Sequence, residues 1–146
     1  MIEKSKREEL VELVNKLFNF TDEQKWDLLI EKVFTETVVF DMSSVSGQPA
    51  SKMSSRTITE NWKRSFEDID SVYHQSGNFL VSFKDEGRAE VTCYATAVHY
   101  RSNARKGTTR EFYGHYDLVC VLTDVGWRIS GLRYIMKFIK GNVELE

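Results

Sequence analysis

Three histidines are the side chains of this 146-residue sequence best suited to proton-transfer chemistry. His74 and His99 lie in stretches that predict two neighbouring strands, and His115 lies in the stretch that predicts the next strand. An unperturbed imidazole has a pKa of about 6.5, so it can accept and donate a proton near neutral pH. Histidines on neighbouring strands therefore indicate general acid–base catalysis. The same pattern also fits histidines that are satisfied core or rim residues.

Two carboxylates could work with these histidines. Asp22 follows a helix start signal at Thr21, and a carboxylate in the first turn of a helix is stabilised by the helix dipole, whatever other role it has. Asp41 ends a short predicted strand. If Asp22 accepts a hydrogen bond from His99, it fixes the tautomer, raises the pKa of that imidazole and leaves the other ring nitrogen to act as base and then acid. His74, opposite, would protonate a leaving hydroxyl group or donate to a carbonyl oxygen.

Composition excludes several function classes. A formal net charge of −2 gives no electrostatic footprint for nucleic acid or an anionic membrane, and no apolar run approaches the roughly 20 residues of a membrane span. Cys93 and Cys120 lack CxxC spacing and predict small buried residues in a reducing compartment. We therefore expect no metal site and no cofactor. The charged amino terminus leads directly into a helix pattern, so we also expect no signal peptide and a cytoplasmic location.

The first half of the sequence predicts helices. Ser5 and Glu8 form a capping box before an amphipathic pattern, and second and third patterns start at residues 21–24 and at Thr57. Between them, residues 37–42 are typical of a short strand. Residues 43–55 are predicted to form a long loop, which would be either a binding lid or a disordered surface segment.

From residue 71 onward the pattern alternates and predicts four long antiparallel strands, with a bulge at Gly77-Asn78 that bends the first of them. One face of the second strand carries small residues and ends in a histidine: Ala89, Val91, Cys93, Ala95, Ala97 and His99. Small side chains on a concave sheet leave space for a ligand pocket. The alternative is that helix aromatics fill this space completely: Trp26, Phe34, Trp62 and Phe66.

The opposite face of the second strand predicts a subunit contact. It carries Tyr94, Thr96, Val98 and Tyr100, an aromatic and β-branched surface suited to burial in a homodimer or homotrimer. His115 shares a strand face with Tyr113 and Asp117, which leaves open whether it lines a site, a subunit interface or the rim. Asp117 itself is a weaker site residue, because such aspartates are usually solvated or paired with an arginine.

Three helices, a short strand and four long antiparallel strands ending in residues 126–132 resemble the SnoaL-like group of the NTF2-like superfamily. The resemblance covers nearly the whole chain, which implies one domain over residues 1–146. It implies an α+β cone, in which three N-terminal helices pack on a strongly curved antiparallel sheet. The pattern is most similar to the scytalone dehydratase family, whose site combines two strand histidines with an aspartate four residues before a tryptophan. His74, His99 and Asp22, which precedes Trp26 by four residues, match these positions.

The sequence also departs from that family. The family pattern has tyrosines at the positions of Thr21 and Met42, where they help to hold a water that polarises the substrate carbonyl. Asp41 resembles instead the general base of ketosteroid isomerase, which lies at the end of the same short strand. Two carboxylates therefore remain possible.

The resemblance implies a small cofactor-independent lyase or isomerase of the dehydratase type. It would transfer protons on an apolar carbonyl compound in the cone pocket, using Asp22, His74, His99 and Asp41. Two other classes stay open. One is a non-catalytic protein that binds a small molecule, and the other is a small structural subunit of a ring-hydroxylating dioxygenase-type complex.

Overall fold

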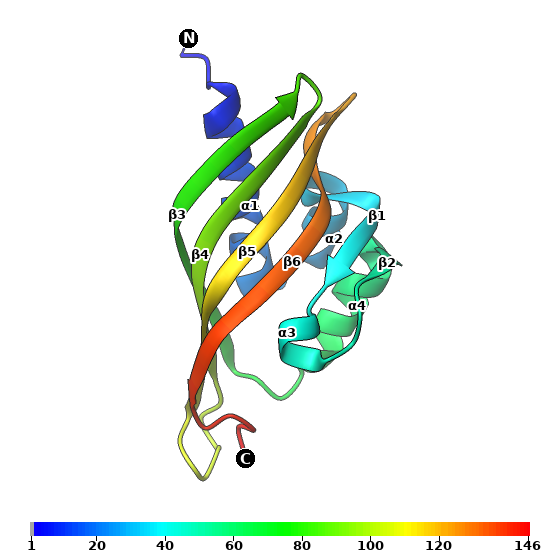
Figure 1. The fold of residues 1–146 in the computed structure, drawn as a ribbon. Helices are drawn as coiled ribbons and strands as arrows, with labels where there is room; N and C mark the ends of the chain where they lie inside the picture. Colours follow the sequence, from blue (N-terminus) through cyan, green and yellow to red (C-terminus); the bar gives the residue numbers. More distant parts are fainter. Residues whose placement is uncertain (1) are drawn as a thin grey trace.

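The computed structural model describes residues 2–146 and confirms the expected α+β class (Figure 1). The helices lie in the first half of the chain, together with two short strands, and four long strands in the second half complete a six-stranded sheet. Within the described residues, no helix combines the length and the apolar character needed to cross a bilayer. In chain order the elements are α1 (Lys6–Asp22), α2 (Trp26–Leu28), η1 (Leu29–Val33), β1 (Phe34–Asp41), α3 (Ser43–Ser46), β2 (Ser51–Ser54), α4 (Ser55–Ser65), β3 (Ser71–Asp85), β4 (Arg88–Tyr100), β5 (Thr109–Thr123) and β6 (Gly126–Gly141).

The sheet has the strand order β2-β1-β6-β5-β4-β3. The four long strands β3 to β6 pair antiparallel with their neighbours in sequence, as predicted. The short strand β1 runs parallel to β6, so the sheet is antiparallel at every pairing but this one. The chain between them is long enough for such a parallel connection, because it contains α3, β2, α4 and three long strands. Figure 1 shows the long strands curving along α1, with α2 and α4 near β1.

Helix α1 begins where the capping box predicts. The Ser5 hydroxyl accepts a hydrogen bond from the Glu8 amide at 3.1 Å, and the Glu8 carboxylate accepts one from the Ser5 amide at 2.7 Å. The helix then runs through Thr21 and Asp22, so the predicted start of a second helix at these residues is wrong. Gln24, with φ of 56°, interrupts the helix, and the chain resumes as the short α2 and the π-helical η1.

Residues 43–55 do not form the predicted irregular loop. They contain α3 and β2, and β2 pairs antiparallel with β1 and extends the sheet. The next helix, α4, starts earlier than the sequence pattern predicts, because Ser54 and not Thr57 is its N-cap. The Ser54 hydroxyl accepts a hydrogen bond from the Thr57 amide at 3.0 Å.

The predicted bulge in β3 is present. Pairing between β3 and β4 shifts register between Gly77 and Leu80, and Asn78 has φ of 56°. The core lies between the inner face of this bent sheet and the apolar side of the helices, with fully buried residues such as Leu10, Leu29 and Leu118. Cys93 and Cys120 are free and buried in it, as predicted.

The residues after β6 fold back onto the strand β5 and the turn before it. The Asn142 amide donates to the Thr109 carbonyl at 2.8 Å, and the Glu146 carbonyl accepts from the Arg105 amide at 2.7 Å. Leu145, within this segment, is buried. The tail, residues 142–146, therefore closes one end of the sheet.

Candidate active site

Asp22 binds His74 through two contacts. The His74 Nδ1 atom lies 2.5 Å from one carboxylate oxygen of Asp22, and the His74 backbone amide donates to the other at 2.9 Å. The two side chains are only 8% and 17% exposed. Because a carboxylate accepts hydrogen bonds, Nδ1 of His74 carries a hydrogen, and in the neutral ring the lone pair is then on Nε2. The Asp22 carboxylate therefore fixes the orientation and the tautomer of the neutral His74 ring.

The hydrogen bond that the sequence suggested between Asp22 and His99 is absent, because Asp22 binds His74 instead. Helix α1 packs against the edge strand β3, which carries His74, whereas His99 lies one strand further into the sheet. Asp22 also occupies the last turn of α1, where the helix dipole disfavours a carboxylate. Asp22 therefore does not stabilise the start of a helix, as its sequence context allowed. Its carboxylate is stabilised by His74 instead.

Phe18 fixes the His74 ring from one side. Their ring centroids are 5.1 Å apart and the planes differ by 22°, which is a stacked arrangement. Phe18 lies one turn before Asp22 on α1, so the same helix supplies both the stacking ring and the carboxylate. This local architecture leaves the His74 imidazole little rotational freedom.

His99 is a neutral donor and not a base. The Arg110 Nε atom donates to its Nδ1 at 2.9 Å. Since a guanidinium can only donate, Nδ1 is unprotonated and the ring hydrogen lies on Nε2. Burial lowers the pKa of His99 to about 3, and the charges of Arg110 and His74 act in the same direction. The sequence predicted a raised pKa for His99, and this expectation is wrong because Arg110 and not Asp22 is its partner.

The lowered pKa of His99 predicts a loss of stability in acid. Between pH 6.5 and about 3 the unfolded chain binds a proton at His99 that the folded chain does not bind. Stability is therefore fully present above about pH 6.5 and decreases as the pH falls through this window. We expect the melting temperature of the wild type to fall more steeply across the window than that of His99→Gln, whose amide oxygen can still accept from Arg110. Parallel curves for the two proteins would contradict this assignment.

Both histidines line one cavity of about 250 Å³. Its wall is largely apolar and comes from α1, α4 and the inner face of the long strands. Of the four aromatics that could have filled this space, Trp62 and Phe66 are part of the wall. Thr21 and Met42, which occupy the family's tyrosine positions, line it too. Asp22 is not a lining residue, so it acts on the cavity only through His74.

Tyr134 adds a polar group that the sequence analysis missed. Its ring lines the cavity, and its hydroxyl is buried without a hydrogen-bond partner among residues 2–146. Burial raises its pKa to about 12, so the phenol stays neutral. Gly114 makes room for it, because a Cβ atom there would lie 2.8 Å from the Tyr134 hydroxyl.

Asp41 and His115 lie away from the cavity. The Asp41 carboxylate accepts from the Ser43 amide at 3.0 Å and lies 3.6 Å from Arg133, and these neighbours lower its pKa, Ser43 most strongly. His115 is on the other face of the sheet, where its ring lies 6.4 Å from that of Tyr94. The structure thus brings His74 and His99 to one cavity and leaves Asp41 and His115 outside it.

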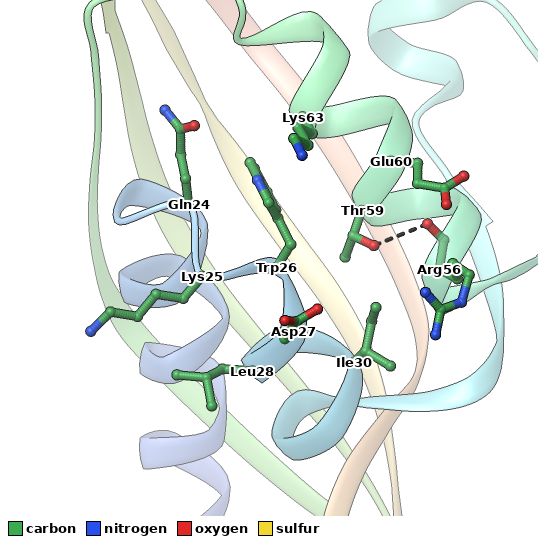
Figure 2. Close-up of a pocket in the computed structure, with 10 residues that line it drawn as sticks. All are labelled: Gln24, Lys25, Trp26, Asp27, Leu28, Ile30, Arg56, Thr59, Glu60 and Lys63. Carbon is green, nitrogen blue, oxygen red and sulfur yellow. Dashed lines mark hydrogen bonds between the residues drawn. The ribbon is translucent and has the colours of Figure 1, made fainter.

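A second hollow, of about 470 Å³, opens between α2 and α4 (Figure 2). Figure 2 shows Lys25, Asp27 and Glu60 around it, and a hydrogen bond of 3.0 Å from the Thr59 hydroxyl to the Arg56 carbonyl. It is larger and more open than the histidine cavity but has no histidine or cysteine in its wall. Among residues 2–146, no group of three or more histidine, cysteine or acidic side chains is arranged to hold a metal ion.

Comparison with known proteins identifies the family. The family model described as SnoaL-like domain matches residues 3–133. No curated protein sequence matches the chain. Among solved structures, the Kfla4162 protein of Kribbella flavida is similar over 95% of both chains, with 25% identity and a TM-score of 0.90.

Two further structures share the fold at lower identity. A candidate scytalone dehydratase of Novosphingobium aromaticivorans has a TM-score of 0.78 and 14% identity, over 90% of this chain and 84% of that one. The beta subunit of benzoate 1,2-dioxygenase from Burkholderia mallei has a TM-score of 0.72 and 14% identity, over 94% and 93%. These two neighbours represent an enzyme class and a subunit class on the same fold.

Proposed function

Since the chain belongs to the SnoaL-like domain family, and since this fold serves both catalysts and subunits, we propose that it is a small cofactor-independent lyase or isomerase of the dehydratase type. Its substrate is an apolar carbonyl compound bound in the cavity. The observation that supports this most is the Asp22–His74 hydrogen bond of 2.5 Å at the cavity wall. The whole chain, residues 1–146, acts as one such domain.

His74 is the general base of the proposed reaction. Its free Nε2 takes a proton from the carbon next to the substrate carbonyl, and the electron pair moves onto the carbonyl oxygen to give an enolate. The Asp22 carboxylate stabilises the positive charge that the imidazole acquires. The imidazolium then returns the proton to another carbon, which is isomerisation, or to a β-hydroxyl group that leaves as water, which is dehydration.

His99 is the electrophilic partner. Its Nε2–H has no partner among residues 2–146 and donates to the enolate oxygen, in surroundings where enclosure strengthens the interaction. The sequence suggested His99 as the base and His74 as the proton donor. In the proposed reaction these two roles are exchanged. Asp41 is not part of the proposal, because it lies outside the cavity and is engaged by Ser43 and Arg133.

Hydrogen exchange into a cyclic ketone tests the proposal. In deuterated buffer, the wild type is expected to speed deuterium uptake next to the carbonyl of tetralone and related ketones, measured by proton NMR. Asp22→Asn keeps the shape but loses the charge that supports His74, so its exchange rate should fall at least about tenfold, less than the roughly 10²–10⁴-fold contributed by the base itself. Asp41→Asn is the matched control and should keep the wild-type rate. Exchange no faster than in buffer, or equal losses in the two variants, would contradict the proposal.

A non-catalytic binding protein is the second function to consider. Thr21 and Met42 favour it, because Met42 has no hydroxyl to hold a water and the shorter Thr21 side chain donates its hydroxyl to the Leu17 carbonyl at 2.6 Å. In that case a ligand would bind in the cavity and His74→Gln would leave its affinity within a few fold. The exchange experiment separates the two functions directly.

The outer face of the sheet supports self-association. Large apolar side chains are exposed there, with Tyr73 at 57%, Tyr94 at 51% and Phe138 at 53%. Stable interfaces concentrate such aromatics at their centre. We therefore propose a homodimer or homotrimer formed through this face.

A further inference from the structure

Arg110 is the one formally charged side chain in the wall of the histidine cavity, within the part of the chain that the structure describes. No aspartate or glutamate lines this space, and the Asp22 carboxylate lies behind His74. Arg110 is half-buried; burial lowers the pKa of its guanidinium, the charge of Glu144 acts in the opposite direction, and Arg110 forms no ion pair among residues 2–146. A charge that is partly removed from water is stabilised by a partner of opposite sign.

The hydrogen bonds of Arg110 go only to neutral acceptors. Its Nε donates to His99 Nδ1 at 2.9 Å, and its Nη1 donates to the Val143 carbonyl at 3.2 Å. The guanidinium carbon also lies 5.7 Å from the centre of the Phe112 ring. These three contacts fix the side chain, while Nη2 has no partner among residues 2–146. A fixed guanidinium with a free nitrogen is organised in advance to bind an anion.

We propose that the ligand of this cavity is an organic acid: besides the apolar body of the proposed function it carries a carboxylate, which binds the free Nη2 of Arg110 while the flat body lies among the cavity's aromatic side chains. This inference rests on the cavity of the proposed function but not on its chemistry. The carboxylate supplies the missing negative charge. It also fixes the ligand's direction, so that the same carbon faces His74 in every binding event. A volume of about 250 Å³ suits a compound of one or two rings.

Three probes of the same shape test the charge preference. Naphthoate, naphthol and naphthalene share one ring system and differ in carrying a carboxylate, a neutral hydroxyl or neither. Near neutral pH, quenching of tryptophan fluorescence should show that the wild type binds naphthoate roughly 10- to 100-fold more tightly than naphthalene, the range of one charge-assisted hydrogen bond. Naphthol should lie close to naphthalene. Equal affinities, or no binding of any probe, would overturn the proposal.

Substitution of Arg110 then assigns the preference to this residue. Arg110→Met removes the charge but keeps the apolar stem, so naphthoate affinity should fall to the level of naphthalene while naphthalene affinity stays within about threefold. Arg133→Met is the matched control, because it removes the same charge from the outer face of the sheet. Circular dichroism checks that each variant is folded, and Arg110→Lys, which keeps the charge, should retain part of the preference. A preference for naphthoate that survives in Arg110→Met would overturn the assignment.

This experiment does not depend on turnover. If ketone exchange fails and naphthoate still binds through Arg110, the cavity is an acid-binding site without the proposed chemistry. If exchange succeeds and the three probes bind equally, the acid-base proposal stands and the inference about the ligand's carboxylate is wrong.

Discussion

Replacing His74 with glutamine is expected to reduce the exchange rate of a ketone substrate by about 10²–10⁴-fold. Glutamine fills a similar volume and its amide can still donate to Asp22, but it has no basic nitrogen to remove a proton. The loss should appear mainly in kcat, because the base acts on the reacting atoms and contributes little to binding. Initial rates over a range of substrate concentrations, measured by NMR in deuterated buffer, give kcat and KM separately.

His115→Gln is the matched control for this substitution. It makes the same histidine-to-glutamine substitution on the other face of the sheet, where His115 lies beside Tyr94 and outside the cavity. We expect its rate to equal that of the wild type. A loss shared by both variants, or a His74→Gln protein that keeps full activity, would exclude His74 as the base.

Gly114→Ala is expected to lower the free energy of unfolding by about 1–3 kcal/mol, the usual range for overpacking. A Cβ atom at this position would lie 2.3 Å from the Ile135 carbonyl oxygen and 2.8 Å from the Tyr134 hydroxyl. Strand β5 shifts its register against β6 at Gly114, so the two backbones approach closely there. Backbone atoms cannot rotate out of the way, and the strands must separate. Urea unfolding followed by circular dichroism measures the change.

Gly77→Ala offers the comparison within the same sheet. Gly77 lies at the bulge of β3, and a Cβ atom there would meet nothing within 4 Å. We expect its free energy of unfolding to stay within about 0.5 kcal/mol of the wild type. If both glycine variants lost the same stability, the cause would be a general effect of alanine in strands and not the contact at Ile135.

Much of the fold could be predicted from the sequence because its signals are local. The capping box at Ser5, the alternation after residue 71 and the bulge at Gly77-Asn78 each depend on residues close together in the chain. The errors have non-local causes. Strand β2 forms because β1 offers it a free edge, and β1 runs parallel to β6, a pairing that no local pattern specifies.

The sequence predicted part of the candidate site but not its connections, and Asp41, which it also suggested, lies outside the cavity. The sequence pointed to Asp22, His74 and His99, and the latter two line one cavity. Whether Asp22 binds His74 or His99 depends on the length of α1, because this length places Asp22 next to the edge strand β3. The partner of His99 was missed because Arg110 is one of several arginines near a predicted loop, and only strand pairing sets it opposite His99. Tyr134 left no signal at all, since an unpaired buried hydroxyl is a property of packing.

The folded-back tail has a practical consequence for handling the recombinant protein. The Val143 carbonyl accepts a hydrogen bond from Arg110, and Arg110 donates to His99. Residues 142–146 are therefore connected directly to the cavity wall. A bulky group attached within residues 142–146 would lie beside the Arg105 turn and close to these contacts, whereas Ile2 is 97% exposed. Surface-coupling groups therefore belong near Ile2 and not within residues 142–146.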